Sequence, residues 1–98
     1  MQFSFNQNEV INEVNISLGE NYPEPFNNYT TIPYNLPEET KGKIVVRDVL
    51  GRIVDVFDVS DTETEIKINT ENWNANFYTY TLEVEGIKIS TKKMILSK

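Results

Sequence analysis

Apolar and polar residues alternate one by one over much of the chain, and this period of two leaves little choice of architecture. The alternation is clearest in residues 78–84 and 63–68, where every second side chain is Tyr, Leu, Val, Ile or Thr. A strand places successive side chains on opposite faces of a sheet, so this pattern is typical of strands with one buried and one wet face. We therefore expect an all-β fold.

About seven short strands separated by turns are expected, with no convincing helix. The expected strands lie near residues 13–18, 30–36, 43–49, 52–59, 63–68, 78–84 and 87–96. A helix is the competing interpretation for the first of them, because Val10, Val14 and Leu18 also lie four residues apart. Pro33 has no N–H and favours an edge position for its strand. This order predicts an immunoglobulin-like antiparallel β-sandwich.

The last expected strand contains an irregularity. Its apolar residues occupy odd positions at Ile87 and Ile89 but even positions at Met94 and Leu96. A strand whose inward face changes parity needs one extra residue, so we expect a β-bulge between residues 90 and 93.

Composition argues against most catalytic chemistry. The 98 residues contain neither cysteine nor histidine. Disulfides, thiolate nucleophiles, the usual zinc ligands and the commonest proton shuttle are therefore all missing. We expect no enzyme, no cofactor and no metal, since the acidic residues between 55 and 65 lack the spacing of a calcium loop.

The formal charge of −6 is unevenly distributed, because residues 87–98 hold four lysines and no acid. An acidic body repels phosphate backbones, so nucleic acid is not expected as a partner. No apolar run approaches the roughly 20 residues of a transmembrane helix. If the domain is exported, its signal peptide belongs to a longer parent protein.

Two local motifs have both a structural and a functional interpretation. Asp48-Val49-Leu50-Gly51-Arg52 has the form of a hairpin turn, with Asp48 bonding its own backbone and Gly51 supplying a positive φ. Residues 91–98 combine a basic pair with an apolar triplet. They fit either an edge strand protected by lysines or a chain end that a receptor grasps.

Aromatic residues cluster before and inside the strand near residue 80. Tyr78 and Tyr80 are expected in the core with their hydroxyls at its rim. Trp73 and Phe77 are the best candidates for an exposed platform that binds sugar or bases, although burial is expected for most of these aromatic residues. The alternative function is therefore an accessory module that binds carbohydrate or protein and is retained in a secreted protein.

Five segments together resemble one known family, the type A C-terminal sorting domain of the type IX (Por) secretion system. The segments, in order and with compatible spacing, are residues 21–27, 30–37, 48–52, 77–82 and 91–96. Two positions depart from the family pattern. Glu24 stands where Asn is usual, and Asn76 stands where a Gly is usual before the aromatic strand.

The resemblance implies a sorting domain over residues 18–98, after a lead-in of residues 1–17. It also implies a larger Bacteroidetes cargo that crosses the periplasm to the cell surface or medium. The partners would be the upstream cargo domain, the outer-membrane translocon and a sortase that removes the signal. By the same resemblance, recognition would involve Asp48, Gly51, Arg52, Tyr78, Lys92, Lys93, Met94, Ile95, Leu96 and Lys98.

Overall fold

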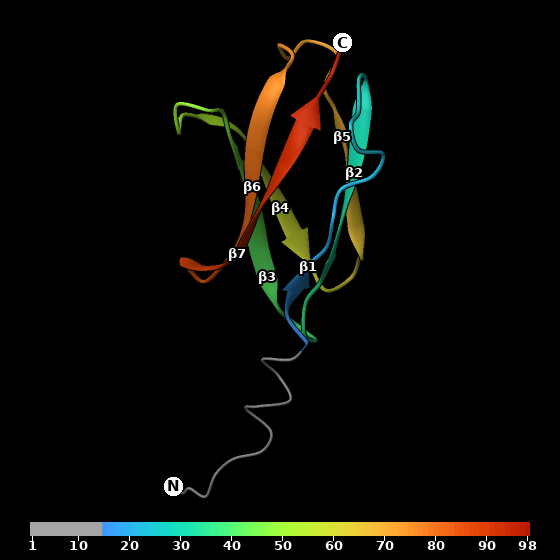
Figure 1. Ribbon diagram of the computed structural model, residues 1–98. Coiled ribbons are helices and arrows are strands. Elements are labelled where there is room, and N and C mark those ends of the chain that lie inside the picture. The colour runs from blue at the N-terminus through green and yellow to red at the C-terminus, as the bar shows by residue number, and fades with distance from the viewer. Residues whose placement is uncertain (1–14) are drawn as a thin grey trace, which may run out of the picture.

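The computed structural model describes residues 15–98 and shows two packed antiparallel sheets (Figure 1). The strands are β1 (Ser17–Leu18), β2 (Tyr29–Asn35), β3 (Lys41–Arg47), β4 (Ile53–Ser60), β5 (Glu65–Asn69), β6 (Asn76–Val84) and β7 (Ile87–Leu96). One sheet has the order β1-β2-β5 and the other β4-β3-β6-β7. This order is consistent with the immunoglobulin-like arrangement. The all-β sandwich of seven strands is therefore confirmed.

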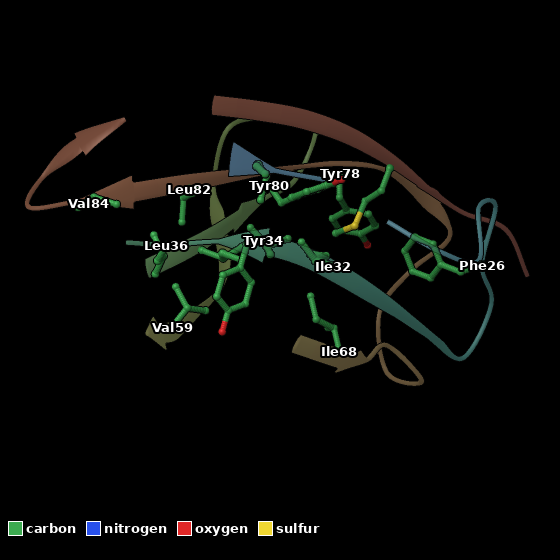
Figure 2. Packing of buried hydrophobic residues seen from close by; sticks show 14 of the residues in the cluster. Phe26, Ile32, Tyr34, Leu36, Val59, Ile68, Tyr78, Tyr80, Leu82 and Val84 are labelled. Carbon is green, nitrogen blue, oxygen red and sulfur yellow. The ribbon is translucent and has the colours of Figure 1, made fainter. Parts of the chain in front are cut away.

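The core lies between the two sheets and is built mainly from inward-facing strand residues, with Phe26 and Leu36 from outside the strands (Figure 2). It comprises Leu18, Phe26, Ile32, Tyr34, Leu36, Ile44, Val46, Val59, Ile68, Tyr78, Tyr80, Leu82, Val84, Met94 and Leu96. Strand β6 supplies four of these side chains, every second residue from Tyr78 to Val84. Full burial of a large apolar side chain stabilises a fold by about 1.5–3 kcal/mol. The period of two thus marks the core face correctly.

Strand β7 contains the expected irregularity, one residue earlier than predicted. Leu82 pairs with Ser90 and Glu83 pairs with Lys88, so Ile89 is the extra residue of a bulge. The inward orientation expected for the two isoleucines of this segment is wrong, because Ile87 is 63% exposed and Ile89 is 38% exposed. Ile89 sits in the bulge itself, and Ile87 belongs to the last pair of the hairpin, where the sheet ends.

Strand β2 is not an edge strand, since it lies between β1 and β5. Pro33 is tolerated because the strand pairing on the β1 side of β2 is interrupted beside it. Gly19 donates its N–H to the Pro33 carbonyl at 2.8 Å, and the next pairing on that side is the bridge between Tyr22 and Thr31. The edge prediction failed because a proline tolerates a gap in the pairing of an inner strand as well as an edge.

The first predicted strand falls only partly within the described residues. Ser17 and Leu18 form β1, which pairs with Asn35 and Tyr34. Positions 13 and 14 of this strand and most of the predicted lead-in lie outside residues 15–98. The competing helix interpretation is not seen in the described part, where residues 15–18 form a turn followed by a strand.

Candidate functional site

The turn between β3 and β4 is organised by one carboxylate. The Asp48 Oδ1 atom accepts the backbone N–H groups of Leu50 (2.9 Å) and Arg52 (3.0 Å), and Oδ2 accepts the Arg52 Nε at 2.9 Å. The Gly51 N–H closes the turn on the Asp48 carbonyl, also at 2.9 Å. The hairpin predicted from the sequence is therefore present, with Arg52 tied to Asp48 rather than simply solvated.

The ionised form of Asp48 is favoured in this turn. Burial by itself raises the pKa of the carboxyl, but the hydrogen bonds from Arg52 and Leu50 and the guanidinium charge outweigh it and lower the pKa below the ordinary 3.8. The carboxylate therefore keeps its hydrogen bonds throughout the neutral pH range. Because the pKa is lowered by folding, the stabilisation is lost only as the pH falls through the folded pKa.

We expect Gly51→Val to destabilise the domain by about 1 kcal/mol through the backbone alone. Gly51 has a φ of +84°, and an added Cβ would meet no heavy atom within 4 Å. The cost is therefore conformational and not a clash. Thermal unfolding measures it, and Gly51→Asn serves as the control because Asn tolerates the left-handed region. Equal melting temperatures for the three proteins would contradict the turn assignment.

The terminal strand β7 has one face in the core and one in solvent. Met94 and Leu96 are fully and almost fully buried, whereas Lys93 is exposed and Ile95 is half-buried on the opposite face. Lys92 lies on the inner face, at its margin, where its Nζ contacts Glu20 at 3.1 Å. Only part of this strand is thus available to a partner.

Residues 24–26 cover the free edge of β7 near its end, which the sequence does not reveal. The Phe26 N–H donates to the Ile95 carbonyl at 3.1 Å, and the Ser97 N–H donates to the Phe26 carbonyl at 2.8 Å. The Glu24 carboxylate accepts the Ile95 N–H at 3.0 and 3.2 Å. These residues form a parallel bridge that ties the chain end to the turn-rich segment. The only signal for their importance is that they belong to the first motif of the resemblance.

A buried polar network holds that segment in place. The Tyr80 hydroxyl donates to the Gly19 carbonyl at 2.8 Å and accepts the Asn21 N–H at 3.0 Å. The Asn21 side-chain amide donates to Glu24 at 2.9 Å and to Thr30 at 3.1 Å. Burial raises the pKa of Tyr80 to about 12, against a lowering by the Asn21 N–H. Tyr80 is therefore neutral at physiological pH and can act as donor and acceptor together.

The turn and the end of the terminal strand lie at the same end of the sandwich (Figure 1). Arg47, next to the turn, pairs with Thr79, which in turn pairs with Lys93. The chain enters the described domain at the opposite end, where Ser17 pairs with Asn35. The turn and the end of β7 thus lie on the side remote from the chain entry, whereas Lys92 contacts Glu20.

The candidate residues differ in what they offer to a partner. Asp48 lies in the turn, partly covered, and Arg52, Lys93 and Lys98 are exposed. Buried side chains are those of Tyr78, Met94 and Leu96. Tyr78 packs against Trp73 with ring centroids 5.1 Å apart, and its hydroxyl bonds the Asn74 carbonyl. The three buried side chains contribute to the packing at this end of the molecule. Their role in recognition stays a prediction.

The candidate aromatic platform of Trp73 and Phe77 is not formed. Trp73 packs inward against Tyr78 and the core cluster. Phe77 points to the outer face of the four-stranded sheet, where it is 47% exposed beside Lys93. The two rings therefore cannot stack on one sugar.

Within residues 15–98, no three acidic side chains gather closely enough to hold a metal ion. The same part of the chain contains no helix with the length and hydropathy required to cross a membrane. A groove of about 650 Å³ lies at the other end of the sandwich and is lined by residues that include Lys41, Lys43, Asp58, Glu83 and Glu85.

The fold is a small β-sandwich with an ordered turn and the end of its last strand at the same end of the molecule. Comparison with known proteins gives the family: the model described as "Secretion system C-terminal sorting domain" matches residues 20–97. The chain belongs to this family and carries a C-terminal sorting signal of the type IX secretion system. No curated protein and no solved structure matched the chain.

Proposed function

We propose that this domain is the address label of a larger cargo, read by the outer-membrane translocon of the type IX system and then removed by a surface sortase. The observation that carries the proposal is the family match over residues 20–97. In this role the domain is ligand and substrate, and the catalysis belongs to the sortase. The cargo would pass through the periplasm and end at the cell surface or in the medium.

The shape of the domain supports this role. A cargo attached ahead of Ser17 would enter at one end and leave the turn and the chain end accessible at the other. We assign direct contact with the translocon to the exposed side chains Arg52, Lys93 and Lys98. We assign a supporting role to Tyr78, Met94 and Leu96, because a buried side chain can influence a partner only by positioning the exposed ones.

The test is a fusion of this domain to a reporter with a signal peptide in a bacterium with a working type IX system. The intact fusion is expected at the surface, and a fusion lacking residues 92–98 is expected to remain inside. This truncation also removes two core residues, so a variant that keeps the core is needed. Arg52→Ala is such a variant, because Asp48 keeps its hydrogen bonds to the backbone N–H groups of Leu50 and residue 52.

Reduced surface delivery of Arg52→Ala at an unchanged unfolding midpoint would separate recognition from folding. Surface delivery of the truncated fusion equal to that of the intact one would overturn the address-label function. Sortase removal is tested separately by the mass of the surface product. An accessory binding module would be retained, whereas a removed signal leaves the product lighter by most of the 11.4 kDa chain.

A further inference from the structure

Three outward side chains form a row across the four-stranded sheet at the end that carries the turn. Arg47 on β3 pairs with Thr79 on β6, and Thr79 pairs with Lys93 on β7. Their chain neighbours Val46, Tyr80 and Met94 belong to the core. Since strand residues alternate between faces, the row points away from the core. Adjacent strands lie about 4.8 Å apart, so the two cations flank Thr79 with backbones about 10 Å apart.

Neither cation of this row is held in a salt bridge within the described domain. The salt bridges found in residues 15–98 use Lys43, Arg52 and Lys92, and neither Arg47 nor Lys93 takes part. A second row on the same face, toward the opposite end, contains Asp58, Lys43, Glu83 and Lys88 and alternates in sign. The Arg47 row is therefore a local positive site on a chain of net charge −6.

Exposed apolar side chains border the positive row. Phe77 lies next along β6 on the same face and is 47% exposed, with the Lys93 Nζ 5.0 Å from its ring centroid. Ile95 is its partner on β7. At the other end of the row, Ile53 pairs with Arg47 and is 58% exposed. Arg and aromatic side chains such as Phe are enriched in the cores of protein interfaces, although Lys is depleted there.

We propose that this surface, made of Arg47, Thr79 and Lys93 with Phe77 and Ile53 at its borders, docks an acidic segment of a protein on the translocon side. The inference rests on the proposed function and names the face and the partner chemistry. A carboxylate above Thr79 would lie within reach of both cations and of the threonine hydroxyl. An apolar neighbour in the partner would cover Phe77 and exclude water, which strengthens the ion pairs.

The distribution of charge favours an acidic protein segment over an anionic membrane or a nucleic acid as the partner. Two cations on a body of net charge −6 are enough for one or two carboxylates. An anionic membrane or a nucleic acid presents a broad negative surface, and the remaining acidic residues would be repelled by it. Lys92 does not contribute, because it lies on the inner face in contact with Glu20.

The test compares two charge reversals of equal size in the reporter fusion. Arg47→Glu with Lys93→Glu should reduce surface delivery about tenfold or more, as expected when like charges oppose each other at an interface. Lys41→Glu with Lys88→Glu changes the net charge by the same amount at the opposite end and should leave delivery close to that of the intact fusion. Both positions are exposed and lie outside the salt bridges found in residues 15–98.

A photo-crosslinking amino acid in place of Thr79 identifies the contacting segment in the living cell. The crosslinked segment should contain Asp or Glu, and changing these to Lys should restore delivery of the Arg47→Glu, Lys93→Glu fusion. The charge-neutral pair Arg47→Gln and Lys93→Gln should show an intermediate loss at an unchanged unfolding midpoint.

Three results would overturn this inference. The first is normal delivery of the Arg47→Glu, Lys93→Glu fusion, and the second is an equal loss with the control pair. The third is a crosslinked segment without acidic residues. In each of these cases the address-label function survives if truncation of residues 92–98 still blocks delivery. If truncation has no effect either, the proposed function itself fails.

Discussion

Replacing Met94 by Ala is expected to lower the free energy of unfolding by about 3 kcal/mol. The Met94 side chain is fully buried, opposite Tyr78 in the neighbouring strand. Its removal leaves a cavity between the sheets, and the surrounding side chains can close it only in part. Urea unfolding followed by tryptophan fluorescence measures the effect, because Trp73 packs against the Tyr78 ring.

Lys93→Ala is the matched control, one residue away on the same strand. The Lys93 side chain is exposed. We therefore expect Lys93→Ala to change the free energy of unfolding by no more than about 0.5 kcal/mol. Similar small effects for both substitutions would show that the end of β7 is not part of the core. The expected contrast implies that loss of export after a deletion of the chain end cannot by itself be attributed to recognition.

Tyr80→Phe should lower the free energy of unfolding by about 2 kcal/mol although it removes a single oxygen atom. That oxygen bonds the Gly19 carbonyl and the Asn21 N–H inside the domain. Without it the Asn21 N–H is buried and unpaired, since Asn21 is only 4% exposed. Equilibrium unfolding in urea measures the change, and Tyr29→Phe, at an exposed position, provides the control.

Tyr80→Phe should also change how the free energy of unfolding depends on pH. Because burial raises the pKa of Tyr80 from 10.0 to about 12, the folded state holds its proton longer than the unfolded state. The stability contributed by this difference is complete below pH 10 and is lost as the pH rises toward 12. Tyr80→Phe should therefore flatten the alkaline decline in stability. Superimposable declines for the two proteins would contradict the buried position of the hydroxyl.

The strands could be predicted from the sequence because alternation reports directly on burial. Residues 78–84 show the period of two and place four side chains in the core. The change of parity in the last strand likewise predicted a bulge, which lies at Ile89. The apolar character of Ile87 suggested an inward side chain, but this residue lies where the sheet ends and is exposed.

The candidate site could be predicted only in its local part. The turn is encoded within five residues, so Asp48 and Gly51 could be assigned their structural roles from the sequence. The cover over β7 joins Glu24 to Ile95, a separation of 71 residues that no local pattern reports. The positive row was missed for the same reason, because Arg47 and Lys93 become neighbours of Thr79 only through the register of three strands.

The parallel bridge between Phe26 and the end of β7 also sets a condition on biosynthesis. Glu24 and Phe26 leave the ribosome early but find their strand only after residues 94–97 have been made. A polypeptide whose translation stops short therefore cannot complete this end of the sandwich. Under the proposed function, an unfinished polypeptide would therefore lack a folded sorting signal. The cell would then export only cargo that had been translated through to the end of the domain.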